Sequence, residues 1–177
     1  MATYTLRPRP LTKASFAAFG EVIDCSDVTP LIINKGNTER YDTLARIELN
    51  NDATDHAAIS LFRAQPRTLP MRIKMLERHP RGSQCFQPLS GEPYFVLVAN
   101  AVEHPQPEDL HLFIAQSDQG VNYKQNTWHH PVLALNKVCD FLVIDRKGPR
   151  HNCEEYMFND EIELPLLDDA MLTRHTP

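Results

Sequence analysis

Short segments with a two-residue period, separated at close intervals by Pro and Gly, most constrain how this chain of 177 residues can fold. Segments 71–76 and 110–115 alternate in side-chain character, as strands with two different faces do. The runs 94–99, 132–135 and 141–144 are apolar and partly β-branched, as strands buried on both faces tend to be. Turn-forming groups separate the segments, at 65–66, 79–82, 90–93, 103–108, 118–120 and 147–149. Many short strands with regular turns predict a mainly β fold, either a sandwich or a closed barrel.

Helix signals are sparse. The segment Thr12–Phe19 begins with a hydroxyl side chain suited to an N-cap, carries Phe16 and Phe19 three positions apart, and is followed by Gly20. A second short helix is predicted near Asp168–Thr173, where acidic residues stand in the first turn. Because no repeat, linker or low-complexity segment interrupts the pattern, we expect residues 1–177 to form a single domain.

Charge and cysteine usage exclude several classes of protein. The net charge is −5 and the Lys and Arg residues are scattered, so no basic footprint for nucleic acid is present. No apolar stretch approaches the ~20 residues that span a bilayer, and the N-terminus has no signal-peptide core. The four cysteines show no C-x-x-C pairing, which favours reduced thiols and a cytoplasmic location. We therefore expect neither a nucleic-acid partner nor a membrane partner.

Two dense polar clusters carry the candidate chemistry. Residues 77–84 read ERHPRGSQ and residues 120–131 read GVNYKQNTWHHP, and both place histidine beside a turn. Because neighbours on an extended strand point to opposite faces, at most one of His129 and His130 faces a pocket directly, and spacing does not say which. His79, Gln84 and one of these histidines could form a metal site or perform metal-free acid–base catalysis. The alternative is structural, with histidines satisfied by hydrogen bonds in the core or at its rim.

A set of six short motifs resembles the ureidoglycolate lyase family. The match runs from about Leu6 to Leu164, and its motifs stand in the family's order at residues 33–41, 77–84, 120–123, 127–131, 140–146 and 152–155. The resemblance implies a cupin-like double-stranded β-helix (jelly-roll) barrel, usually a homodimer, acting in allantoin and purine breakdown. The implied reaction splits (S)-ureidoglycolate into glyoxylate and urea, although older descriptions of the family give a hydrolase that releases ammonia and carbon dioxide.

Cleavage of this substrate sets three chemical tasks. One substrate carbon carries a hydroxyl, a carboxylate and the urea nitrogen, so a base must take the hydroxyl proton while an acid protonates the departing nitrogen. His79, His130 and Glu155 are the candidates for these two proton transfers. A cation must hold the carboxylate, with Arg better suited than Lys to a bidentate contact. The candidates for this task are Arg40, Arg72 and Lys137, and those for contacts with the ureido group are Ser83, Gln84, Tyr94, Tyr123 and Asn126.

A metal is compatible with the residues but not required by them. Metal-binding cupins typically carry His-x-His, a following Glu and a later His, whereas here Pro80 and Arg81 follow His79. The ligands of any divalent ion would be His79, Gln84 and His130, and nickel is the first expectation because some members of the family are described as nickel-dependent. The incomplete motif favours proton transfer led by histidine over a fully ligated metal centre.

Two other functions fit the same residues. A metal-dependent cupin oxygenase or isomerase would lose activity with a chelator and regain it with a divalent ion. A non-catalytic module that binds a small carboxylate would gain thermal stability from its ligand without turnover. The density of polar residues in 82–84 and 122–130 favours catalysis, because binding pockets are mostly apolar with few polar groups.

Overall fold

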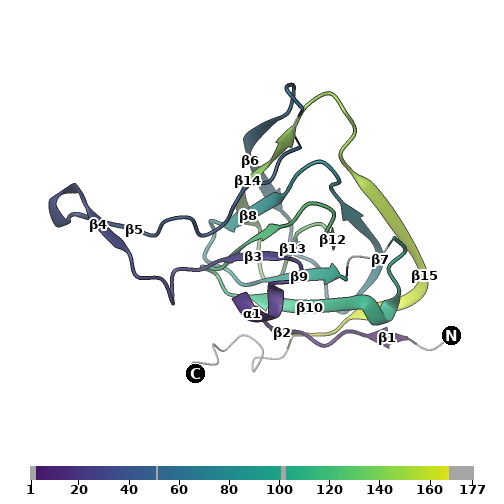
Figure 1. The fold of residues 1–177 in the computed structure, drawn as a ribbon. Helices are drawn as coiled ribbons and strands as arrows, with labels where there is room; N and C mark the ends of the chain where they lie inside the picture. Colours follow the sequence, from purple (N-terminus) through teal and green to yellow (C-terminus); the bar gives the residue numbers. More distant parts are fainter. Residues whose placement is uncertain (1–2, 51, 101–102, 168–177) are drawn as a thin grey trace.

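The computed structural model describes residues 3–50, 52–100 and 103–167, and its secondary structure consists mainly of strands (Figure 1). Each run expected to form a strand does so, in β7 (Met71–Arg78), β9 (Tyr94–Ala99), β10 (Leu110–Ala115), β13 (Leu133–Ala134) and β14 (Cys139–Lys147). The other strands are β1 (Tyr4–Thr5), β2 (Arg9–Pro10), β3 (Gly20–Ile23), β4 (Leu31–Ile33), β5 (Thr38–Arg40), β6 (His56–Ala64), β8 (Gln84–Pro88), β11 (Gly120–Tyr123), β12 (Trp128–His129) and β15 (Glu154–Leu164). Helix α1 (Lys13–Phe16) and two 3₁₀ turns, Asn34–Gly36 and Pro107–Asp109, complete the elements of the described residues.

Two curled sheets face one another. The larger has the order β1-β15-β7-β12-β9-β10-β2, with β13 paired to β9, and the smaller has the order β3-β11-β8-β14-β6. Alternate side chains of both sheets point into a shared core, among them Val96, Val98 and Phe113 from one sheet and Phe86 and Phe141 from the other. This arrangement confirms the prediction of a mainly β, cupin-like barrel.

Strand β9 is buried on both faces, as its unbroken apolar run predicts. Val96 and Val98 belong to the core between the sheets, whereas Phe95 and Leu97 belong to a second apolar cluster with Trp128. A strand that separates two clusters needs apolar side chains at every position, so alternation is absent there.

The predicted N-terminal helix is present but shorter than expected. Helix α1 spans Lys13–Phe16, and the Thr12 side chain accepts from the backbone N–H of Ser15 at 3.1 Å as its N-cap. Phe16 is fully buried and meets Phe113 edge-on. Gly20 does not end the helix but starts β3, where a Cβ atom would overlap the carbonyl oxygen of Asn122. The second predicted helix, near Asp168–Thr173, lies outside the described residues.

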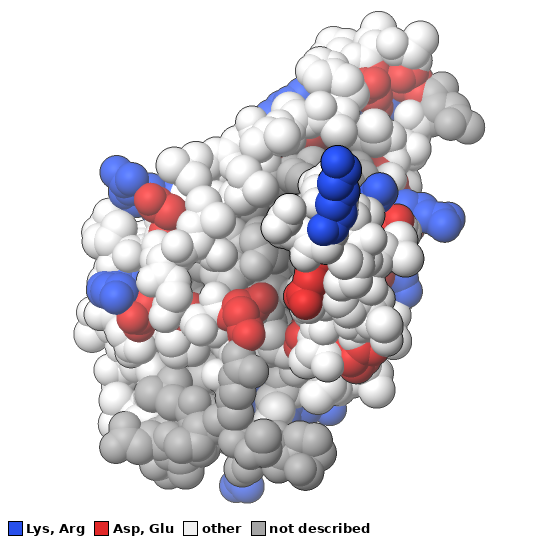
Figure 2. Space-filling view, turned by 90° about the vertical axis from the view of Figure 1, so that its left-hand side faces the viewer, with Lys and Arg blue, Asp and Glu red and all other residues white. Residues whose placement is uncertain are grey.

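A two-stranded hairpin projects from the body of the barrel (Figure 1). Strands β4 and β5 pair with each other, Leu31 opposite Arg40, and form a sheet of their own. We call residues 31–40 the arm. Figure 2 faces the side from which the arm projects, and there Lys and Arg alternate with Asp and Glu among uncharged residues.

No helix within the described part of the chain has the length and apolar character needed to cross a bilayer.

Candidate functional site

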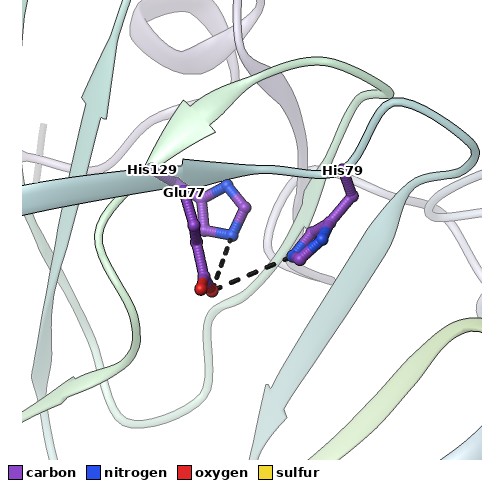
Figure 3. A group of neighbouring side chains, drawn as sticks. All are labelled: Glu77, His79 and His129. Atoms are coloured by element: carbon purple, nitrogen blue, oxygen red, sulfur yellow. Dashed lines mark ion pairs between the residues drawn. The ribbon is translucent and has the colours of Figure 1, made fainter. Parts of the chain in front are cut away.

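The end of β7 and the short strand β12 bring three potential metal ligands together (Figure 3). Glu77 and His79 are two positions apart at the end of β7, so their side chains leave the same face of the chain. Strand β12 lies beside β7 with His129 directly opposite Glu77, which places its ring on that same face. His129 also lies opposite Val98, whose side chain belongs to the core between the sheets. The cluster therefore faces the interior of the barrel.

The three side chains are within reach of a single ion. Glu77 Oε1 lies 3.6 Å from Nε2 of His129 and 3.9 Å from Nε2 of His79. One ligand atom of each of the three residues lies within 4.8 Å of the other two. The side chain of His129 is 1% exposed, whereas those of His79 and Glu77 are 14% and 19% exposed. The cluster is thus buried at one end and open to solvent at the other.

Main-chain carbonyl groups fix the tautomers of both rings. His79 Nδ1 lies 2.6 Å from the carbonyl oxygen of Asn152, and His129 Nδ1 lies 2.8 Å from that of Thr127. Because a carbonyl oxygen only accepts hydrogen bonds, each Nδ1 carries a proton and donates it. Each neutral ring then presents a lone pair on Nε2 toward Glu77. Metal-binding histidines in proteins show this same arrangement.

The electrostatics of the cluster keep the carboxylate charged and His79 neutral near pH 7. Burial raises the pKa of Glu77, but the hydrogen bond that a protonated His129 would donate from Nε2, together with the charges that His129 and His79 can carry, outweighs burial and holds this pKa below its ordinary value. Burial lowers the pKa of His79, and the neighbouring His129 lowers it further. A charged carboxylate beside a neutral imidazole is the state that binds a divalent cation.

Gln84 and Tyr123 complete the inner wall of the cluster. The side-chain oxygen of Gln84 lies 3.1 Å from Nε2 of His79 and 3.2 Å from Nε2 of His129. Rotation of the Gln84 amide group by half a turn exchanges its NH₂ group and its oxygen. The NH₂ group can donate to these nitrogens, and the oxygen can serve as a further metal ligand. Tyr123 stacks on the His129 ring, with centroids 4.2 Å apart and planes at 12°. Both contacts restrict the rotation of His129.

The donor set fits a divalent transition metal. Such ions bond imidazole nitrogen and carboxylate oxygen at about 2 Å, so ligand atoms around one ion lie about 3–4 Å apart. The separations of 3.6 Å and 3.9 Å fall within that span. Two neutral imidazoles with one carboxylate suit nickel, iron or zinc better than magnesium or calcium, which prefer oxygen ligands alone.

Strand β15 supplies the open rim of the cluster. Glu155 lies directly opposite Glu77 in the strand pairing and therefore shares its face. Cys153, two positions earlier, has its Sγ 3.7 Å from Glu77 Oε2. Burial and the charges of Glu77 and Glu155 raise the pKa of this thiol to about 11, so it stays protonated. The exposed Glu155 carboxylate thus stands on the solvent side of the cluster.

A buried ion pair holds the loop that presents the Asn152 carbonyl. The side chains of Asp55 and Arg146 are 0% and 2% exposed and contact each other directly. Arg146 Nη1 also donates to the carbonyl oxygen of Arg150 at 2.6 Å, which ties the start of the loop to the end of β14. Gly148 leaves the space for this pair, because a Cβ atom there would overlap both partners.

Three of the residues proposed for substrate contact form hydrogen bonds within the chain. The Ser83 hydroxyl accepts from the backbone N–H of Glu48 at 2.9 Å, and the Tyr94 hydroxyl donates to the carbonyl oxygen of Gln119 at 2.9 Å. Asn126 has a positive φ of 66°, and its backbone N–H donates to the His79 carbonyl oxygen at 3.0 Å. Gln84 and Tyr123 are the members of this group that the structure brings to the cluster.

The structure places the three proposed cations away from the cluster, each in an ion pair with another carboxylate. Arg40 lies on the arm and pairs with Asp42, Arg72 pairs with Glu161, and Lys137 pairs with Glu92. None of these three ion pairs includes Glu77, His79 or His129. Their assignment to the substrate carboxylate remains a prediction without a supporting contact.

Of the two adjacent histidines, His129 joins the cluster. His130 instead donates from Nδ1 to the carbonyl oxygen of Pro131 at 2.7 Å, and its burial lowers its pKa. The alternation of neighbouring side chains predicts that one of the two faces inward, but not which one. The pairing of His129 opposite Glu77 shows that His129 is the one that faces inward.

Glu77 is the functional candidate that sequence reasoning missed. The His-x-His pattern predicts a second ligand after His79, where Pro80 and Arg81 stand, whereas in the structure Glu77 lies two positions before His79. The signal was present in the alternation of 71–76, because continuing the odd-numbered face by two steps reaches Glu77 and His79.

Comparisons of the sequence with known proteins identify the family. Residues 3–165 match the family model described as ureidoglycolate lyase. A protein of Rhizobium leguminosarum bv. trifolii with that name is 49% identical over 150 residues, covering 85% of this chain and 89% of the relative. A Pseudomonas aeruginosa protein with that name is 47% identical over 93% of this chain and 96% of its own length. A protein of that name from Stutzerimonas stutzeri is 45% identical over 96% of this chain and 99% of its own length. The chain therefore belongs to the ureidoglycolate lyase family.

Proposed function

We propose that this chain is a ureidoglycolate lyase, which splits (S)-ureidoglycolate into glyoxylate and urea. The observation that carries the proposal is the convergence of Glu77, His79 and His129 inside the barrel of a chain that belongs to this family. Such a cluster is more polar than a pocket built for binding alone.

The reaction requires two proton movements around one bond cleavage. The hydroxyl proton of the substrate passes to a base, and the electrons of that O–H bond form the new carbonyl group of glyoxylate. The carbon–nitrogen bond breaks with its electrons on nitrogen, and an acid protonates this nitrogen to release urea. No oxidant or reductant is needed, so the reaction requires general acid–base catalysis.

Glu77, His79 and His129 are proposed to hold a divalent ion, with nickel as the first candidate. When bound, the ion would act as a Lewis acid toward the hydroxyl and carboxylate oxygens of the substrate. Gln84 orients the two imidazoles, and the neutral Tyr123 supports His129 from behind. Burial raises the pKa of Tyr123, so its hydroxyl stays protonated and does not compete for the proton.

Glu155 is the proposed proton carrier at the mouth of the site. It shares a face with Glu77 and is exposed, so its carboxylate can accept a proton and pass it to the departing nitrogen. His130 remains the second candidate for this role, because its ring is neutral at pH 7 and lies within electrostatic range of His129 and Glu77.

Glu155→Gln should therefore lower kcat by about 10²-fold while leaving metal affinity unchanged, since glutamine keeps the shape but cannot carry the proton. His130→Ala, measured beside it, should cause a smaller loss. Steady-state kinetics and metal content are the two readouts. The opposite order of effects would transfer the proton role to His130.

One assay tests the proposed activity. The protein is incubated with racemic ureidoglycolate, and urea, glyoxylate and ammonia are measured separately. We expect urea and glyoxylate to rise together and to stop near half conversion, because one enantiomer is used. Ammonia in place of urea would support a hydrolase, and no product above the spontaneous rate would reject both activities.

A metal-dependent oxygenase is the second candidate, favoured by one observation. Two histidines and one carboxylate are also the ligand set of non-haem iron oxygenases. Such an enzyme would consume oxygen when loaded with ferrous iron. A lyase would form urea and glyoxylate equally fast under strict exclusion of oxygen.

Three broader expectations belong to the same proposal. We infer that residues 1–177 form one domain around this site and that the chain functions as a homodimer. We also infer a cytoplasmic location, which the four free thiols support, since no pair of cysteines within the described residues forms a disulfide.

A further inference from the structure

Asp145 is a buried carboxylate on the inner face of β14, beside the cluster of three potential metal ligands. It follows Phe141 and Val143 on that face, and both of these side chains belong to the core between the sheets. In the strand pairing Asp145 lies directly opposite Gln84, whose side-chain oxygen contacts both histidines of the cluster. Side chains opposite each other on paired strands are close neighbours. Asp145 therefore stands one strand away from Gln84, at the same level of the barrel as the cluster.

One carboxylate oxygen of Asp145 has no hydrogen-bond partner among the described residues. The residue is 9% exposed, its Oδ1 is buried, and no group in the described part of the chain donates to that oxygen. Its Oδ2 lies 3.4 Å from Nζ of Lys147, which is longer than the roughly 2.7–2.9 Å of a strong bond between an ammonium group and a carboxylate. Buried carboxylates that serve the fold alone are normally paired. An unpaired oxygen beside a polar cluster therefore indicates a group that accepts hydrogen bonds from a ligand.

Lys147 is a cation on the same face of β14. It stands two positions after Asp145, so both side chains leave the strand on the inner side, and the Lys147 side chain is 53% exposed. Arg146, between them, points to the other face and contacts the buried Asp55. The three cations proposed from the sequence for the substrate carboxylate lie in ion pairs with other carboxylates. Lys147, in contrast, is a solvent-accessible cation on the wall of the candidate site.

The chemistry of ureidoglycolate is complementary to these two side chains. A monosubstituted urea presents two N–H donors on one edge, and a carboxylate can accept both of them with its two oxygens. The substrate carboxylate requires a cation, because the carboxylates of Glu77 and Glu155 stand on the same wall of the site and repel an anion. Three bonds of roughly 1.3–1.5 Å join the carbinol carbon of the substrate to its terminal nitrogen, and neighbouring strands are about 4.8 Å apart. A substrate bound beside Gln84 therefore reaches β14.

We propose that Asp145 and Lys147 recognise the two ends of the substrate, Asp145 by accepting from the N–H groups of the ureido end and Lys147 by binding the carboxylate. This inference rests on the proposed function, because it takes ureidoglycolate as the ligand. The hydroxyl and one carboxylate oxygen of the substrate face the cluster, and the ureido group extends past Gln84 to β14. The contact between Lys147 and Asp145 compensates both charges until the substrate replaces it, and the movement of the exposed Lys147 side chain gives the ureido group access to Asp145.

Three stable analogues of the substrate separate the two contacts. N-carbamoylglycine keeps both ends and lacks the hydroxyl group, so this reaction cannot cleave it. N-carbamoylglycinamide replaces the carboxylate by a neutral amide, and N-acetylglycine replaces the terminal NH₂ group by a methyl group. The wild type should bind N-carbamoylglycine more tightly than either of the other two by about 10-fold or more, as expected for one hydrogen bond to a charged group. Isothermal titration calorimetry on the full chain measures the three dissociation constants.

Each of two substitutions should abolish one preference and retain the other. Lys147→Met should bring the preference for N-carbamoylglycine over its amide close to unity, and Lys147→Arg should retain that preference because arginine keeps the positive charge. Asp145→Asn should bring the preference over N-acetylglycine close to unity, because asparagine keeps the volume of aspartate but offers a single neutral acceptor. Comparing preferences within one variant removes any uniform effect of the substitution on binding.

Two matched controls lie outside the site. Lys74→Met removes an exposed lysine from β7, and Asp140→Asn removes a carboxylate from the same strand as Asp145. Asp140 alternates with the buried Phe141 and therefore points to the opposite face of β14. Both controls should show the two preferences of the wild type, and circular dichroism verifies the fold of every variant.

Several results would overturn the proposal. These are a wild type that does not bind N-carbamoylglycine, a wild type without the two preferences, and an equal change in the controls. Calorimetry needs no turnover, so this test and the lyase assay can fail separately. A protein without lyase activity that shows the predicted losses would reject the reaction and support the recognition by Asp145 and Lys147. An active lyase whose preferences survive both substitutions would reject the recognition alone.

Discussion

Replacement of Glu77 by glutamine should lower turnover of ureidoglycolate by about 100-fold or more and remove most of the affinity for a divalent metal. Glu77 supplies the one negative charge of the cluster, and its Oε1 lies within 4 Å of Nε2 of both histidines. Glutamine keeps an oxygen donor and nearly the same volume, so the fold should persist. The loss of turnover and of metal affinity would therefore measure the contribution of the negative charge of Glu77. Metal binding is measured by titration calorimetry of the metal-free protein, and turnover by the release of urea.

Glu154→Gln is the matched control for this substitution. Glu154 accepts from Arg78 Nε at 2.7 Å, and both residues lie on the opposite face of the strand pair from Glu77. It removes one carboxylate from the same pair of strands without touching the cluster, so metal affinity and turnover should match the wild type. Full metal binding and full turnover in Glu77→Gln would exclude Glu77 from the site.

Replacement of Asp55 by asparagine should lower the free energy of unfolding by about 3–5 kcal/mol, because it leaves the Arg146 guanidinium buried without a counter-charge. The Asp55 and Arg146 side chains are almost completely inaccessible to solvent. Domains of this size are stable by about 5–15 kcal/mol, so such a loss is a large part of the total. Urea unfolding followed by fluorescence measures it. Because Arg146 holds the loop before Asn152, metal affinity should fall as well.

Asp140→Asn breaks a comparable ion pair at the surface and serves as the control. Its partner Arg63 is 65% exposed, and ion pairs in such positions contribute little to stability. The unfolding midpoint of Asp140→Asn should remain close to that of the wild type. Equal shifts in the two variants would mean that burial of the Asp55–Arg146 pair has no special role.

Most of the barrel could be predicted from the alternation of side chains, because the sequence of each barrel strand shows which of its two faces is buried. The runs that became β7, β9, β10 and β14 contain either two distinct faces or two buried ones, and both patterns are visible in sequence. The arm and β6 gave no such signal. All residues of β4 and β5 and most of those of β6 are exposed, so burial does not impose a regular alternation on their sequences.

The candidate site was predictable in its segments but not in its members. The polar clusters at 77–84 and 120–131 contain Glu77, His79, Gln84, Tyr123 and His129. The choice of His129 over His130 depends on the pairing of β12 with β7, a contact between residues more than fifty positions apart. Glu77 shares a face with His79 because β7 continues past Glu77 to Arg78, which keeps the chain extended between the two residues. Local sequence does not determine either relation.

The carbonyl groups that hold His79 and His129 bear on how this enzyme can change during evolution. Both acceptors belong to the main chain, at Asn152 and Thr127, and every amino acid provides the same oxygen there. No single substitution at either position deletes the acceptor, so the orientation of the two rings is robust to point mutation. Insertions or deletions that alter the path of these two loops would be far more damaging. We expect natural variation in this family to change the side chains of the two loops more freely than their lengths.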